Sequence, residues 1–229
     1  MDLASRLAET DARIADAARS AGRDPSEITR IVVTKFHPAS LVQELYDLGV
    51  RDVGENRQQE LSAKVPAVGP LPGLRWHFVG QAQTKKSRAI RAAASVVHSV
   101  DRARLADALD AAADGGEGEP ALDVLLQVNL TDDVARGGVS PEGVAALAEH
   151  VNGCRTLRLR GVMAVAPLDE PPAAAFERLR ACADDVRSVA PDARWISAGM
   201  TADFVEALAA GATHLRIGSA ITGPRPVHG

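Results

Sequence analysis

Lys35 is the residue whose type and setting best suit covalent chemistry. It follows the β-branched run Ile31-Val32-Val33-Thr34, and strand alternation places Ile31, Val33 and Lys35 on one face. If the two aliphatic side chains fill the interior of a barrel, the amine lies above an apolar layer at its mouth. Partial desolvation lowers the pKa of such an amine and increases the fraction able to attack an aldehyde. Lys35 is therefore a candidate Schiff-base lysine, with a solvated lysine at a strand end as the alternative.

Two segments rich in glycine and hydroxyl groups are candidates for phosphate binding. They are Ser197-Ala198-Gly199-Met200-Thr201 and Arg216-Ile217-Gly218-Ser219, and each joins a predicted strand to the start of a helix. Glycine lets the backbone approach a ligand, and the hydroxyls can donate hydrogen bonds. Barrels commonly bind phosphate after their seventh and eighth strands, so we interpret the pair as a phosphate cup. For either segment alone, a helix cap at Thr201 or a simple turn at Ser219 is the alternative.

Arg216 is predicted to point into the barrel. It shares strand parity with His214 and Gly218, whereas Leu215 and Ile217 take the opposite face. A buried guanidinium needs an acceptor, which could be a carboxylate such as Glu55 or an electron pair on a ligand.

Other polar residues favour structural over catalytic roles. His77, His98 and His214 lack metal-ligand spacing, so no metal site is predicted. The basic cluster from Lys85 to Arg91 is interpreted as a solvated helix face, with contact to an anionic ligand as the alternative. Cys154 and Cys182 have no activating base or CxxC motif, which favours reduced, unreactive thiols.

The elements that position these residues alternate between strand and helix. Strands are predicted at Ile31–Lys35, Arg51–Val53, Arg75–Val79, Val96–Val100, Leu122–Asn129, Leu157–Val165, Arg194–Ala198 and Thr213–Ile217. Helices are predicted from Leu3 to before Gly22, from Pro38 to Gly49, and at Arg57–Lys64, Lys85–Ala94, Arg102–Ala113, Pro141–Asn152, Ala173–Val189 and Ala202–Ala209.

This alternation predicts a parallel sheet with right-handed crossovers, closed as a (β/α)8 TIM barrel, with an open doubly wound sheet as the alternative. The glycine-rich stretch 115–118 falls in a predicted helix-to-strand loop, where a dinucleotide-binding fingerprint does not belong. No linker marks a second domain, so residues 1–229 are expected to form one barrel domain.

Composition excludes several classes of protein. The 229 residues carry a net charge of −4 and are only 3% aromatic, so neither phosphate-backbone attraction nor base stacking is expected and no nucleic acid partner is predicted. The charged first twenty residues do not resemble a signal peptide, and no apolar run is long enough to span a bilayer. We expect a cytoplasmic protein with no membrane contact.

Taken in order, the motifs resemble the pyridoxal 5′-phosphate homeostasis protein family from about residue 3 to residue 226. They are Val33-Thr34-Lys35, Val53-Gly54-Glu55-Asn56, Trp76-His77-Phe78-Val79-Gly80, Gln83-Thr84-Lys85-Lys86-Ser87-Arg88, Val97-His98-Ser99-Val100-Asp101, Gln127-Val128-Asn129, Leu159-Arg160-Gly161-Val162-Met163, Ser197 to Thr201, and Arg216 to Ile221.

The resemblance implies a fold similar to the alanine racemase barrel, a fold-type III barrel without the racemase's C-terminal β domain. It implies pyridoxal phosphate as cofactor, held as an internal aldimine on Lys35, with Arg216 facing the pyridine nitrogen. The remaining cofactor-binding residues that it implies are Asn56 and Met163 near the ring and Ser197, Gly199, Met200, Thr201, Gly218 and Ser219 at the phosphate. The chain departs from the family at Phe36, where a small residue is common, at Lys85, often an Asn, and at 134–137.

The predicted function is a non-catalytic carrier in intracellular pyridoxal phosphate homeostasis, which influences amino-acid and keto-acid pools. An Arg at the pyridine nitrogen can only donate, so the ring is a poor electron sink. Alanine racemase also uses a Tyr from its second domain, whereas the one Tyr here, Tyr46, is predicted in a helix. We expect a monomer that passes the cofactor to dependent apoenzymes. The alternatives are a weak racemase or lyase dependent on pyridoxal phosphate, and a class I aldolase.

Overall fold

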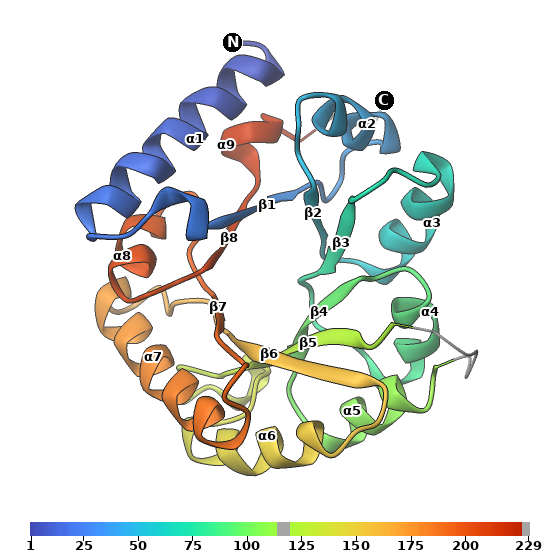
Figure 1. Ribbon diagram of the computed structural model, residues 1–229, viewed down its shortest axis with the longest axis vertical. Coiled ribbons are helices and arrows are strands. Elements are labelled where there is room, and N and C mark those ends of the chain that lie inside the picture. Colours follow the sequence, from blue (N-terminus) through green and yellow to red (C-terminus); the bar gives the residue numbers. More distant parts are fainter. Residues whose placement is uncertain (114–119, 226–229) are drawn as a thin grey trace.

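Parallel strands form a closed barrel. The computed structural model describes residues 1–113 and 120–225, and within them eight strands pair in chain order (Figure 1). The strands are β1 Thr29–Val33, β2 Asp52–Glu55, β3 Arg75–Phe78, β4 Val96–Val100, β5 Leu122–Gln127, β6 Leu157–Met163, β7 Trp195–Ser197 and β8 His214–Ile217. Ile31 of β1 pairs with Arg216 of β8, which closes the ring. The predicted barrel is thus confirmed, and the doubly wound alternative is excluded.

Helices surround the barrel (Figure 1). They are α1 Leu3–Ser20, α2 Ala39–Asp47, α3 Gln58–Val68, α4 Ser87–Arg91, α5 Ala103–Asp110, α6 Val144–Asn152, α7 Pro172–Val189, α8 Phe204–Ala209 and α9 Ser219–Thr222, with 3-10 turns at Pro25–Glu27, Thr84–Lys86, Val134–Arg136 and Pro141–Gly143. The helix predicted at Lys85–Ala94 is shorter than expected, because its first residues form a 3-10 turn. The glycine-rich stretch 115–118 lies outside the described residues.

The first helix shows how local sequence sets an element. The Asp2 side chain accepts a hydrogen bond from the Ser5 amide at 2.8 Å, and this N-cap satisfies an otherwise unpaired donor of the first turn. Leu7, Ile14 and Ala18 form its buried face. The helix ends just before Gly22, whose φ of 70° suits a glycine.

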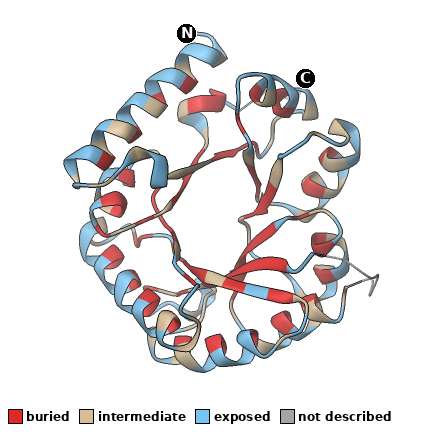
Figure 2. Ribbon diagram, in the orientation of Figure 1, coloured by how far each residue is buried: buried red, intermediate tan, exposed pale blue. Residues whose placement is uncertain are grey.

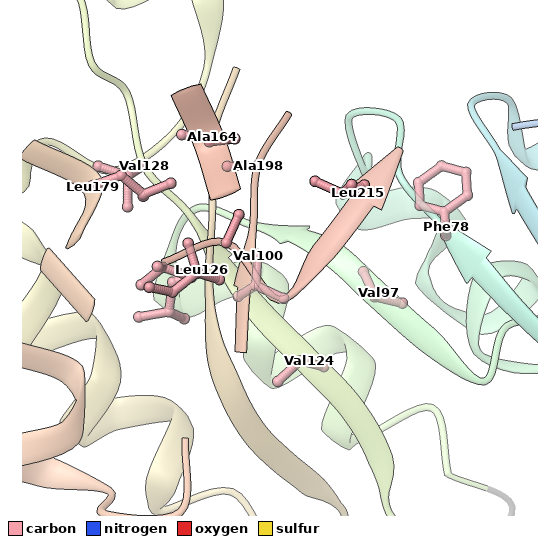
Figure 3. Packing of buried hydrophobic residues seen from close by; sticks show 14 of the residues in the cluster. Phe78, Val97, Val100, Val124, Leu126, Val128, Ala164, Leu179, Ala198 and Leu215 are labelled. Carbon is pink, nitrogen blue, oxygen red and sulfur yellow. The ribbon is translucent and has the colours of Figure 1, made fainter. Parts of the chain in front are cut away.

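The hydrophobic core is the layer between the strands and the helices. In Figure 2 the strands and the inward faces of the helices are buried, whereas the outer helix faces are exposed. Figure 3 shows residues of this layer that come from several strands, such as Val97, Val124 and Leu215, together with Leu179 of α7. Alternate strand residues therefore face outward into an apolar layer, as parity predicts.

The opposite strand face lies inside the barrel and is largely polar. A small apolar cluster of Val96, Leu125 and Met163 is separate from the main core. His77 and His98 are fully buried here, on the face opposite the helix layer. No helix in the described part of the chain has the length and apolar character needed to cross a membrane.

Candidate functional site

The predicted site residues lie on neighbouring strand ends. At the carboxyl edge, β2, β1, β8, β7 and β6 are consecutive neighbours and carry, in that order, Asn56, Lys35, Gly218 with Ser219, Gly199 to Thr201, and Met163. Gly218 lies beside the end of β1, since a Cβ on it would be 3.7 Å from the Val33 carbonyl oxygen. The barrel therefore brings the predicted lysine and the predicted phosphate loops together on one arc of its rim.

Lys35 is exposed at this rim. Strand β1 ends at Val33, and Thr34 is the last buried residue before the chain leaves the barrel wall. Its parity is as predicted: Ile31 and Val33 are buried beside Gly54, where a Cβ would be 3.0 Å from Ile31 Cγ2. Lys35 follows this buried pair and is itself exposed, so the partial desolvation of its amine stays a prediction.

Phe36 gives the lysine loop an unusual backbone. Its φ of 69° is the only positive value for a non-glycine among the described residues. The Phe36 amide donates to Glu60 Oε2 at 2.7 Å, and the Arg225 guanidinium lies 3.4 Å from the ring centroid. The ring lines a groove of about 650 Å³ between α2 and α3. Phe36 therefore forms part of the surface beside Lys35.

A buried ion pair lies beneath the lysine loop. Lys64 of α3 donates to Glu55 Oε1 at 2.5 Å and to the Thr34 carbonyl at 2.8 Å, and the Thr34 hydroxyl donates to the same Glu55 oxygen at 2.6 Å. Burial raises the pKa of Glu55, although Lys64 and Thr34 act in the opposite direction. Among the described residues, Glu55 Oε2 has no hydrogen-bond partner. Sequence reasoning missed Lys64, which is set on a helix with no motif around it.

Arg216 is buried and held by acceptors of the protein. Its Nη1 donates to the carbonyl and to the hydroxyl oxygen of Ser197, both at 2.7 Å, and its Nη2 donates to the Ala164 carbonyl at 2.8 Å. Burial lowers the pKa of Arg216 to about 10. The inward orientation is confirmed, but Glu55 as its partner is wrong because that carboxylate turns toward Lys64.

Three residues of the predicted phosphate cup have structural tasks. The Ser197 hydroxyl faces Arg216 and His98 inside the barrel, and the Met200 amide donates to Asp203 Oδ1 at 2.6 Å. Gly199 has a φ of 90°, and a Cβ there would be 2.7 Å from the Ala207 Cβ, so helix packing requires glycine. These groups are thus committed within the chain.

The other cup residues remain open to a ligand. A Cβ on Gly218 would have no atom closer than 3.7 Å, so its missing side chain leaves the rim accessible beside Val33. Ser219 is exposed, and Thr201 is half-buried. Asn56 is half-buried on the other side of Lys35, and Met163 is buried in the small interior cluster.

The remaining polar residues divide into buried and surface groups. Arg91 is buried, so the predicted solvated helix face is wrong at that residue. Cys182 is buried and both cysteines are free; burial raises the pKa of the Cys182 thiol to about 11. Among the described residues, one group of potential metal ligands lies together at the surface: Asp107, His150 and Cys154.

Comparisons with known proteins identify the family. Residues 7–226 match the family model described as "Alanine racemase, N-terminal domain". A Pseudomonas aeruginosa protein named "Pyridoxal phosphate homeostasis protein" is 42% identical over 226 residues, which cover 97% of this chain and 96% of the relative. This chain belongs to the pyridoxal phosphate homeostasis protein family. The resemblance drawn from the ordered motifs is confirmed.

Solved structures of similar fold include one that is described with PLP bound. PipY of Synechococcus elongatus, described with PLP bound, is 33% identical, has a TM-score of 0.83, and is aligned over 97% of this chain and 100% of its own. Alanine racemase from Corynebacterium glutamicum has a TM-score of 0.69 at 12% identity, with 96% of this chain and 62% of that one aligned. That second likeness concerns the barrel fold alone.

The donors on the rim fit pyridoxal phosphate. The family's cofactor presents an aldehyde, a ring nitrogen and a phosphate. The arc presents an exposed amine at Lys35, a buried permanent donor at Arg216, and an open glycine with an exposed hydroxyl at Gly218 and Ser219. These three kinds of group are complementary to the three parts of the cofactor.

Proposed function

We propose that this protein binds pyridoxal phosphate on Lys35 and acts as a carrier and buffer in intracellular homeostasis of the cofactor. The observation that carries the proposal is the convergence of Lys35, Arg216 and the Gly218–Ser219 segment on adjacent strand ends. The lysine amine holds the aldehyde covalently, and the glycine segment with Thr201 holds the phosphate. The bound cofactor supplies an aldehyde that reacts reversibly with amines.

Arg216 is central to the absence of strong catalysis in this proposal. The guanidinium keeps a positive charge at neutral pH and offers hydrogens only, so a ring nitrogen facing it receives no transferable proton. A carboxylate at this place would support proton gain and carbanion chemistry. The buried arginine thus favours holding the cofactor over reacting with it.

The position of Tyr46 supports the same conclusion. The sequence has one tyrosine, and its hydroxyl donates to the Pro72 carbonyl at 3.0 Å while its ring lies against the Arg51 guanidinium. These contacts hold Tyr46 beside Arg51, which immediately precedes β2, and so at the amino ends of the strands and not at their carboxyl ends. The tyrosine acid of a racemase therefore has no counterpart among the described residues of the rim.

Reconstitution tests the binding proposal. The chain contains four lysines, so borohydride treatment of protein loaded with pyridoxal phosphate, followed by peptide mass spectrometry, reports directly which one is modified. We expect a visible absorption band in the loaded protein and label on Lys35. Lys35→Ala should lose both, whereas Lys85→Ala, at another exposed lysine, should keep both. A wild-type protein that gains no band, or label elsewhere, would contradict the proposal.

Deuterium exchange tests the absence of catalysis. Loaded protein is incubated with an amino acid in deuterated water, and α-hydrogen exchange is followed by NMR. We expect no exchange above the rate of free pyridoxal phosphate. Exchange that exceeds that rate and disappears in Lys35→Ala would establish the weak racemase or lyase instead.

The proposed carrier role also implies a location in the cell, an oligomeric state and a protein that receives the cofactor. We propose a cytoplasmic monomer, one barrel domain over residues 1–229, that delivers cofactor to apoenzymes dependent on it. Light scattering of the loaded protein should give the mass of one chain. Mixing with an apoenzyme should activate it while free cofactor stays low.

A further inference from the structure

A continuous line of hydrogen bonds crosses the barrel interior beneath Arg216. Asp52 Oδ1 lies 2.8 Å from His77 Nε2, His77 Nδ1 lies 2.9 Å from His98 Nε2, and His98 Nδ1 lies 2.9 Å from Ser197 Oγ. Arg216 Nη1 completes it at 2.7 Å from the same hydroxyl oxygen. The two histidines and Ser197 are fully buried. We call these residues the interior relay.

The chemistry of the two ends gives the relay one direction. An ionised carboxylate only accepts, so His77 must carry its hydrogen on Nε2, and its Nδ1 then accepts from His98 Nε2. His98 Nδ1 is left to accept from the Ser197 hydroxyl. Arg216 only donates, so it gives its hydrogen to Ser197 Oγ. Every bond therefore points from Arg216 toward Asp52.

The surroundings keep both imidazoles neutral, as this pattern requires. Burial lowers the pKa of His77, with Asp52 opposing, and lowers that of His98 well below its ordinary value. Arg75 acts in the same direction as burial on the pKa of both rings, and His214 does so on that of His98. The side chain of Asp52 is 20% exposed; burial acts to raise its pKa, but the hydrogen bond with His77 helps to keep that pKa below its ordinary value. One carboxylate thus ends a relay of neutral rings.

The interior relay does not form a catalytic triad in which a base activates Ser197 as a nucleophile. A serine beside a histidine and a carboxylate resembles a hydrolytic triad in its order of groups. Ser197 is fully buried, however, and Arg216 already donates to its oxygen. A substrate cannot approach that oxygen, so orientation is the task left to the hydroxyl.

We propose that Asp52, His77 and His98 are positioning residues that fix the Ser197 hydroxyl, and through it the Arg216 guanidinium, in the orientation that faces a bound cofactor ring. This inference rests on the proposed function, because Arg216 is the group assigned to the ring nitrogen. The two carbonyl contacts anchor the guanidinium, and the relay keeps the Ser197 oxygen's lone pairs turned toward it. The distant carboxylate at the start of β2 therefore acts on affinity for pyridoxal phosphate.

The first test needs no substitution and no cofactor. Imidazole nitrogen NMR of the cofactor-free protein near pH 7 distinguishes the neutral tautomers. We expect His77 and His98 both to carry hydrogen on Nε2. A hydrogen on Nδ1 of either ring, or a protonated ring, would overturn the directed relay.

The second test compares two carboxylate variants. An amide at position 52 can either accept a hydrogen bond from His77 or donate one to it. Asp52→Asn therefore removes the acceptor-only group that fixes the direction of the hydrogen bonds in the relay. Asp107→Asn is the matched control, because Asp107 makes a similar contact with His150 at 2.6 Å on the surface. We expect Asp52→Asn to weaken pyridoxal phosphate binding about three- to tenfold, the worth of one hydrogen bond, and to shift the visible band. Asp107→Asn should change neither.

The outcomes separate this inference from the proposed function. If wild type binds and Asp52→Asn is folded with the same affinity and the same band, the relay does not position Arg216. If wild type fails to bind pyridoxal phosphate at all, the proposed function fails, while the tautomer measurement still decides whether the directed relay exists.

Discussion

The two cationic groups of the candidate site are held in opposite ways. Arg216 is buried, and its guanidinium donates to the carbonyl oxygens of Ser197 on β7 and of Ala164, which follows β6. Lys35 is exposed on a loop whose next residue has left-handed backbone. One cationic group is thus fixed by acceptors of the protein, and the other is an exposed amine on a strained turn.

The buried polar groups behind them differ in the same way. The interior relay behind Arg216 joins neutral rings whose nitrogens are all paired. The group behind Lys35 is a charged pair, Glu55 with Lys64, in which Glu55 Oε2 has no hydrogen-bond partner in the part of the chain that the structure describes. A network of neutral, fully paired rings favours one geometry, whereas a buried ion pair is sensitive to any change in either partner.

Lys64→Met tests the charged side and should have the largest effect. It leaves Glu55 buried without its cation, and we expect the free energy of unfolding to fall by about 3–5 kcal/mol. Urea denaturation measures the change. Glu55→Gln combined with Lys64→Met should recover much of it, and Lys85→Met, at an exposed lysine, should stay within about 0.5 kcal/mol of wild type. A mild effect of Lys64→Met alone would mean that the ion pair does not support the loop.

Local patterns in the sequence were sufficient for the barrel. Short β-branched runs separated by glycine, proline and amphipathic helices locate strands such as Ile31–Val33 and Val96–Val100 without tertiary information. Two features were not predictable from such patterns. Helix α9 has only four residues, too few to show a helical period, and the left-handed backbone at Phe36 is not indicated by the sequence because phenylalanine disfavours that conformation.

Contacts between side chains needed information that the sequence pattern lacks. Parity placed Arg216 inside the barrel correctly, but parity does not say which residue lies opposite, and Glu55 was the wrong partner. His77 and His98 meet because His77 pairs with Val96 in the β3–β4 register, which brings a residue two positions further along into reach. Strand register is a tertiary property, so the relay was not predictable from spacing alone.

Acidification tests whether the buried histidines of the barrel interior stay neutral. His214, buried beside Trp195, has its pKa lowered by burial to about 3 from an ordinary 6.5. Below pH 6.5 the unfolded chain takes up a proton on this residue that the folded chain does not. Stability is therefore lost as the pH falls from 6.5 toward 3, by about 1.4 kcal/mol per pH unit for each such histidine.

His77 and His98 have lowered pKa values as well, so they add to the same slope. Urea denaturation at intervals from pH 7.5 to 5 should show this decline in the free energy of unfolding. His214→Asn should reduce the slope of that free energy against pH by the amount that corresponds to about one bound proton. Constant stability across that range would show that the buried histidines become protonated in the folded protein as readily as in the unfolded chain. The barrel interior would then not differ from the Glu55–Lys64 pair in excluding charge.

Substitutions at Phe36 test the strained turn beside Lys35, and they have the smallest expected effect on stability. Phe36→Ala and Phe36→Asn both lose the ring and its contact with Arg225, so they differ mainly in backbone preference. Asn tolerates left-handed backbone better than Ala, and the cost of that conformation for an ordinary residue is roughly 1–2 kcal/mol. We expect the Asn variant to be more stable than the Ala variant by about 1 kcal/mol in urea denaturation. Equal stabilities would indicate that the loop relaxes once the ring is removed, so that the aromatic packing itself, and not the turn, holds the backbone beside Lys35 in its strained form.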